Sequence, residues 1–139
     1  SGSNMAFQRK VFETYGGFSP NYGMLKGKLR MGEDTELFFR IYEKEPWFWY
    51  NPKIRVLHWT PLRNMQVSYR FWRAFKGGES VAYMHCRSIF SIAYVRRWIS
   101  LILLFAGFLF QALRGSAKTE LVKKLEEIGH SLGYLIGKL

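Results

Sequence analysis

The sequence predicts an α/β fold of short strands and helices followed by apolar and amphipathic helices, and three patterns lead to this prediction. Residues 33–44 carry apolar side chains at helical spacing, which indicates an amphipathic helix. Residues 47–50 and 54–59 are rich in aromatic and β-branched side chains and flank Asn51-Pro52, which is typical of two short strands around a turn. Residues 88–113 are almost wholly apolar, which favours helices that contact a membrane.

Composition limits the domain organisation and the partners. A chain of 139 residues suffices for one domain with one core plus an appendage. Its 21 Lys and Arg against 10 Asp and Glu give a formal charge of +11, so the partners to consider are nucleic acid, acidic lipid headgroups and a nucleotide diphosphate. The single cysteine, Cys86, excludes an internal disulfide and a zinc site built on several thiolates.

The composition changes near residue 88, so we expect two parts, residues 1–87 and residues 88–139. In the first part, residues 4–7 indicate a short strand and Arg9–Tyr15 a helix, which Gly16-Gly17 ends.

A third helix, with a basic face, is expected at residues 65–87, bent or interrupted at Gly77-Gly78. The basic face consists of Arg63, Arg70, Arg73 and Lys76. Such a face suits anionic lipid headgroups first and a diphosphate leaving group second, because it leads into an apolar segment; a solvated helix face is the third alternative.

The uncharged run at residues 98–113 is short for a membrane span. As a helix its 16 residues cover ~24 Å, less than the ~30 Å of a hydrocarbon core. Extending it toward residue 89 would place Arg96-Arg97 inside the bilayer. An interfacial or re-entrant helix fits this pattern better than a perpendicular span.

The last segment predicts an amphipathic helix with a partner. Its apolar side chains repeat at alternating spacings of four and three residues, at Leu121, Leu125, Ile128, Leu132, Leu135 and Leu139. Gly129, Gly133 and Gly137 add a ridge of glycine at every fourth position, which lets a second helix approach closely. The preceding helix is a candidate for that partner.

One motif carries candidate chemistry, the adjacent carboxylates Glu33-Asp34 that follow Gly32 and begin a helix. A helix N-terminus stabilises negative charge by roughly 0.3 to 1 kcal/mol, so ordinary capping explains the pair taken alone.

The order of the neighbouring motifs gives further evidence about the function of Glu33-Asp34. The motifs are Gly2-Ser3-Asn4, Arg9-Lys10-Val11-Phe12, Gly16-Gly17-Phe18, Gly32-Glu33-Asp34-Thr35-Glu36-Leu37 and His58. This succession resembles the C-terminal half of family 2 glycosyltransferases, inverting enzymes with the Rossmann-like GT-A fold, over roughly residues 2 to 60. The resemblance implies that residues 1–87 form the acceptor-side half of such a domain and residues 88–139 a membrane-associated tail.

The resemblance also implies residue roles. Asp34 would be the general base that accepts the acceptor's proton, and Glu33 would hold the acceptor or position the loop. Substrate binding falls to Asn4, Gly32, Trp59, Arg70 and Arg73. His58 matches a place where some relatives hold the divalent metal; a packed or hydrogen-bonded structural histidine is the alternative.

The chain departs from the family in two ways. It contains no Asp-x-Asp motif, so the divalent metal, Mg or Mn, would be held mainly by a donor-binding half preceding residue 1, and this chain alone is expected to be inactive. The Gln-x-x-Arg-Trp motif of processive synthases is missing too, which favours single addition.

Two functions follow. The first is part of a membrane-associated glycosyltransferase that transfers a sugar with inversion from a nucleotide-sugar donor to a glycan or lipid-linked cell-envelope acceptor, with its active site on the cytoplasmic side. The second is a non-enzymatic module whose basic and aromatic residues bind an anionic membrane surface and whose last helix pairs with a partner. Nucleic-acid binding ranks last.

Overall fold

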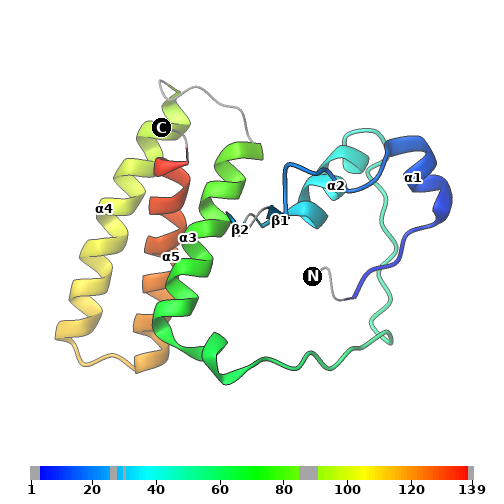
Figure 1. Ribbon diagram of the computed structural model, residues 1–139. Helices are drawn as coiled ribbons and strands as arrows, with labels where there is room; N and C mark the ends of the chain where they lie inside the picture. Colours follow the sequence, from blue (N-terminus) through cyan, green and yellow to red (C-terminus); the bar gives the residue numbers. More distant parts are fainter. Residues whose placement is uncertain (1–3, 26–27, 30, 85–90, 138–139) are drawn as a thin grey trace. The chain divides into compact units, whose positions relative to one another are not determined.

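The structure is a computed structural model that describes residues 4–25, 28–29, 31–84 and 91–137 (Figure 1). Contacts divide the chain into two compact units, Ser1–Thr60 and Pro61–Leu139. The boundary that the sequence predicts, between residues 87 and 88, lies outside the described residues.

The first unit contains two of the predicted helices. Helix α1, Arg9–Tyr15, has the predicted bounds and ends at Gly16, whose φ of 77° is a left-handed conformation that favours glycine. Helix α2, Glu33–Tyr42, begins where the sequence predicts and ends two residues earlier than predicted. The loop between them contains a hairpin of β1, Met24–Leu25, and β2, Lys28–Leu29.

Aromatic rings hold the first unit together. The Phe7 ring lies 5.5 Å from that of Phe12 and 5.4 Å from that of Phe38 between ring centroids, and Phe38 meets Phe48 edge-on at 5.0 Å. In the same unit Leu37, on the apolar face of α2, is fully buried. Phe7 is therefore held by ring packing.

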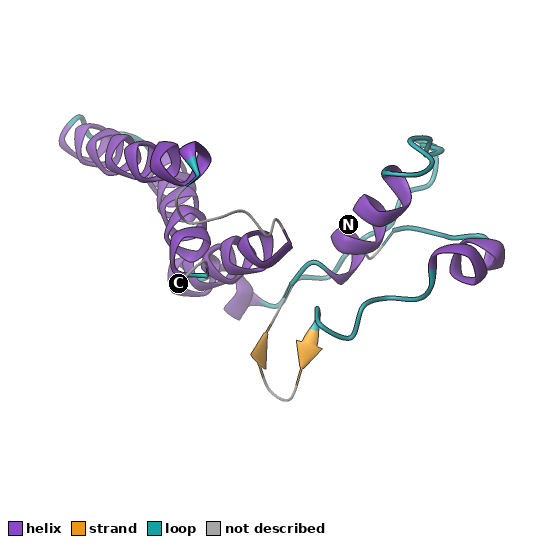
Figure 2. Cartoon of the chain, turned by 90° about the horizontal axis from the view of Figure 1, so that it is seen from above, coloured by secondary structure: helices purple, strands orange, loops and turns teal. Residues whose placement is uncertain are grey.

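The predicted α/β class is wrong. Within the described residues the strand pairing is confined to β1 and β2, where Met24 pairs antiparallel with Leu29, and Figure 2 shows this hairpin in orange. The predicted strands at residues 4–7, 47–50 and 54–59 are irregular or extended chain. High β-propensity reflects a good fit to a pleated, half-buried surface, and these segments have no neighbouring strand to supply one.

The second unit is helical. After a short 3₁₀ turn, Leu62–Met65, it consists of α3, Val67–Met84, α4, Ile92–Leu113, and α5, Lys118–Ile136. Helix α5 packs against both α3 and α4, as Figure 1 shows. The α-helix α3 continues through Gly77-Gly78, so the interruption that the sequence allows there is absent.

Glycines bring the backbones of α3 and α5 into contact. A Cβ atom at Gly133 would overlap the carbonyl oxygen of Phe75, and one at Gly78 would overlap that of His130. At Gly129 a Cβ would lie 2.9 Å from the carbonyl oxygen of Phe71. The partner of the predicted glycine ridge is thus α3, which runs parallel to α5, and not the preceding helix α4.

Helix α4 packs on another face of α5. Leu101 of α4 and Ile128 and Leu135 of α5 are buried together in one cluster. The N-terminus of α4 is capped by Ser91, whose hydroxyl accepts a hydrogen bond from the Tyr94 amide at 3.3 Å. This start makes α4 six residues longer than the uncharged run of the sequence and includes Arg96 and Arg97.

Replacing Gly133 with alanine tests the backbone contact. We expect Gly133→Ala to lower the free energy of unfolding by about 1 to 3 kcal/mol, because the new methyl group forces α3 and α5 apart. Gly107→Ala is the matched control in α4, where no atom lies within 4 Å of an added Cβ. In the control, the free energy of unfolding should rise by up to about 1 kcal/mol, because alanine has a higher helix propensity than glycine. Urea unfolding followed by circular dichroism measures both, and equal effects would contradict the close contact.

Candidate functional site

The predicted catalytic pair lies in the first turn of α2. Gly32 precedes the helix with a φ of 101°, and Glu33, exposed, and Asp34, half-buried, follow it. An Asp34 carboxylate oxygen accepts hydrogen bonds from the Thr35 amide at 2.8 Å and the Thr35 hydroxyl at 3.3 Å. Both carboxylates thus lie in the first turn, where a helix N-terminus stabilises negative charge, but no described side chain makes an N-cap hydrogen bond to this helix.

Of the other predicted residues of the first unit, Gly32 precedes α2 directly, and Asn4, His58 and Trp59 lie in other segments. The Asn4 side-chain amide donates to the carbonyl oxygen of Ile54 at 3.2 Å. His58 and Trp59 lie in the extended segment after α2, where Trp59 is 81 % exposed. Across the described part of the chain no three His, Cys, Asp or Glu side chains are grouped to hold a metal ion. Binding of Mg or Mn at His58 stays a prediction.

The two predicted arginines belong to the second unit and differ in their contacts. Arg70 makes a two-pronged ion pair with Glu126 of α5, with N···O distances of 2.6 and 3.0 Å. This ion pair connects α3 to α5, and it occupies the guanidinium that the sequence assigns to substrate binding. Arg73, on the same helix, is exposed.

No protein-family model, curated protein or solved structure is significantly similar to this chain. The assignment to family 2 glycosyltransferases is therefore wrong. No family match supports it, and the described residues form helices and one short hairpin where the GT-A fold requires a Rossmann-like sheet. The roles of Asp34, Glu33 and Asn4 in sugar transfer rested on that resemblance.

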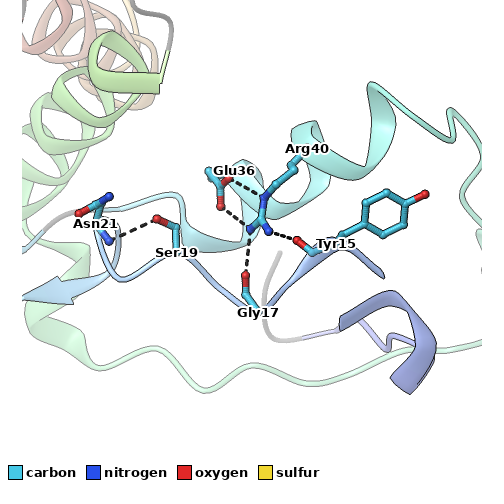
Figure 3. Close-up of polar contacts among 6 residues, drawn as sticks. All are labelled: Tyr15, Gly17, Ser19, Asn21, Glu36 and Arg40. Carbon is cyan, nitrogen blue, oxygen red and sulfur yellow. Dashed lines mark hydrogen bonds and ion pairs between the residues drawn. The ribbon is translucent and has the colours of Figure 1, made fainter. Parts of the chain in front are cut away.

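An arginine that the sequence analysis missed organises the first unit. Figure 3 shows the Arg40 guanidinium between the two carboxylate oxygens of Glu36, both at 2.9 Å, and backbone carbonyl oxygens at and just after the end of α1. It donates to the carbonyl of Tyr15 and, at 2.9 Å, to that of Gly17. The hydrogen bonds that Arg40 donates to the Glu36 carboxylate raise the pKa of Arg40 above its usual value. The four-residue spacing of Glu36 and Arg40 is the signal that sequence offers for this pair.

Shortening Arg40 tests this structural role. We expect Arg40→Ala to destabilise the first unit by roughly 1.5 to 3 kcal/mol, because hydrogen bonds from a charged donor are lost and two carbonyl groups lose their partner. Arg9→Ala, which removes an exposed ion pair with Glu13, is the control and should cost well under about 1 kcal/mol. Proteolysis within residues 9–42 measures the loss, and equal cleavage rates for both variants would contradict it.

The most unusual surface of the described chain is the apolar side of α4. Leu101, Leu104 and Phe108 face α5, whereas the opposite side of the helix carries large apolar residues that stay exposed. We call this side the outward face; its residues are Ile92, Val95, Ile99, Ile102, Leu103, Leu109, Phe110 and Leu113. Only 6 % of the most apolar stretch of α4 is buried, which distinguishes it from the core helix of a soluble protein.

By length and composition α4 can cross a membrane. Its 22 residues span about 33 Å, which exceeds the ~30 Å hydrocarbon core. The two arginines near its start differ in environment. Arg96 is exposed, while the Arg97 guanidinium lies over the ring of Tyr134 on α5, 4.7 Å from the centroid.

An open hollow of about 540 Å³, with more apolar than polar lining surface, lies where the three long helices meet. Arg97 and Ser100 of α4 line it together with Glu126, Glu127, His130 and Ser131 of α5, and Ala74 is the contribution of α3. Burial, with a smaller contribution from the nearby Arg97, lowers the pKa of His130 below its ordinary value. His130 is therefore neutral at physiological pH. We call this feature the Arg97 hollow.

The lowered pKa of His130 predicts a pH dependence of stability. The unfolded chain binds the His130 proton more tightly than the folded chain, so stability is highest above the ordinary pKa of 6.5 and falls as pH drops through that value. Arg97, Glu126 and Glu127 line the same hollow, and Arg97 is the one that opposes protonation. Urea midpoints measured from about pH 8 to about pH 5 should decrease, and His130→Gln should remove part of this decrease. Identical profiles for both proteins would contradict the prediction.

Proposed function

We propose that this chain is a non-enzymatic membrane-surface module that attaches to anionic lipid through the outward face of α4. The observation that carries the proposal is the contiguous apolar side of that helix, with Leu103 at 66 % and Leu113 at 89 % exposure. Exposed apolar patches of this extent mark contacts with membranes or proteins. Basic residues beside such a face favour a membrane surface.

The packing of α5 along α4 favours an in-plane helix over a span. The first half of α5 carries six charged side chains, Lys118, Glu120, Lys123, Lys124, Glu126 and Glu127. If α4 stood perpendicular in the bilayer, these groups would enter the hydrocarbon with it, and a charged residue at the bilayer centre costs ~2.5 to 3.5 kcal/mol. An in-plane α4 buries its outward face by ~5 to 10 Å and leaves α5 on the aqueous side.

The net charge supports an anionic surface. Each Lys or Arg near such a membrane contributes about 1 kcal/mol of attraction, and the chain carries a formal charge of +11. Exposed Arg73 and Arg96 belong to helices of this unit. Because anionic lipids are concentrated in the cytoplasmic leaflet, we assign the module to that side of the membrane.

The extended segment after α2 offers a further lipid contact. Trp47, Trp49, Tyr50 and Trp59 are each more than four-fifths exposed. Indole and phenol rings combine an apolar body with a polar group and concentrate at the headgroup level of membranes. Lys53 and Arg55 lie between them in the sequence and add positive charge. This segment therefore suits interfacial contact without insertion of a helix.

Vesicle binding tests the proposal. Wild type should sediment with vesicles that contain phosphatidylglycerol, and added salt should weaken the binding. Leu103→Asp should weaken it by about tenfold or more, because burying one leucine contributes ~1.5 to 3 kcal/mol. Thr14→Asp in the first unit changes the net charge equally at an exposed site and serves as the control. Equal losses in both variants would contradict attachment through the outward face.

Depth measurements distinguish the in-plane helix from a span. Single nitroxide labels at Val95, Leu103 and Phe110, in a Cys86→Ser background, all lie on the outward face. An in-plane helix places the three labels at similar depth, as quenching by lipid-soluble and water-soluble reagents would show. A central label much deeper than the outer two would establish a span and overturn the in-plane orientation.

A further inference from the structure

We propose that the Arg97 hollow binds the phosphate group of an anionic phospholipid, with the Arg97 guanidinium as its main contact. The inference rests on the proposed membrane attachment and adds a specific site to it. The hollow is lined by side chains of α3, α4 and α5, which are far apart in the sequence. Its position is set by the packing of those helices on one another.

The charges around the hollow leave Arg97 available for an anion. Glu126 accepts both hydrogen bonds of the Arg70 guanidinium, and Glu127 pairs with Lys124 at 2.8 Å. Within the described residues no carboxylate forms an ion pair with Arg97. The charged groups that line the hollow, Arg97, Glu126 and Glu127, sum to −1. With Arg70 and Lys124, which pair with the two glutamates, the five groups sum to +1.

The packing of Arg97 prepares it for this role. Its guanidinium lies against the Tyr134 ring at 4.7 Å, which restricts the side chain to one side of α5. A guanidinium that stacks through its face keeps N–H groups at its edge, and these match the oxygens of a phosphate. The hydroxyls of Ser100 and Ser131 and the His130 ring supply neutral hydrogen-bonding groups in the same lining.

The setting favours a lipid phosphate over a soluble one. The hollow's volume of about 540 Å³ is many times the ~30 Å³ share of a water molecule, so glycerol can enter together with a phosphate. Leu104 adds an apolar wall, and Arg97 is followed in α4 by Trp98, a residue type typical of membrane interfaces.

The test uses short-chain lipids that stay monomeric in water, so it does not depend on vesicle attachment. Dihexanoyl phosphatidylglycerol, dihexanoyl phosphatidylcholine and inorganic phosphate are titrated separately into the full chain below the micelle concentration, with amide and His130 ring NMR signals as readout. The anionic lipid should give saturable shifts at residues 97, 100, 130 and 131, and should raise the pKa of His130 because a negative charge stabilises its protonated form.

Two variants that remove the same charge distinguish binding at a specific site from general electrostatic attraction to the basic chain. Arg97→Gln should weaken binding of the anionic lipid about tenfold, whereas Arg96→Gln, next to it but outside the hollow, should change it less than about threefold. Ser100→Leu narrows the hollow and should also weaken binding, although it makes α4 more apolar. The His130 NMR signal of each ligand-free variant reports whether the helices remain packed.

The experiments distinguish failure of the proposed lipid site in the Arg97 hollow from failure of the proposed membrane attachment. Equal loss in the Arg97 and Arg96 variants, or equally tight binding of inorganic phosphate or phosphatidylcholine, would overturn the site while vesicle binding could still hold. Saturable binding of monomeric lipid without any vesicle binding would support the site and overturn the attachment. If Arg97→Gln unfolds the unit, the Ser100→Leu variant provides the test of the site. Unchanged lipid binding in Ser100→Leu would overturn the site as well.

Discussion

The backbone contact between α3 and α5 is the interaction on which the rest of the helical unit depends. At Gly133 and Gly78 no side chain separates the two helices, so neither can rotate or slide without a clash or a gap. This fixed pair leaves another face of α5 for α4, and the cluster of Leu101, Ile128 and Leu135 forms there. The Arg97 hollow exists because α5 holds α3 and α4 at its two sides.

The same packing gives α4 two sides of different chemical character. Its α5 side carries Arg97 and the residues that meet the core, and its outward face is apolar. A helix of this length in isolation is a candidate span, but α5 brings a row of charges alongside it. Tertiary packing, and not hydropathy alone, therefore decides how α4 relates to a bilayer.

Local periodicity predicts much of the helical structure, because the pattern is contained within each segment. Helix α1 and the start of α2 lie where the sequence predicts them from the positions of glycines and the spacing of apolar residues. The predicted strands are wrong because strand formation depends on a partner that no local pattern identifies. The glycine ridge of α5 predicts a close helix, yet its choice of α3 over α4 depends on contacts about sixty residues away in sequence, at Phe75 and Phe71. For the same reason the sequence does not reveal the carbonyl partners of Arg40, Tyr15 and Gly17.

The outward face of α4 also determines how copies of this chain behave toward one another in water. Two molecules can cover their apolar sides mutually, so self-association competes with lipid for the same residues, Leu103 and Phe110 among them. The fraction of free monomer then falls as protein concentration rises, and the apparent affinity for lipid falls with it. On the proposed attachment, a membrane would compete with self-association for this face and would convert assemblies into surface-bound monomers.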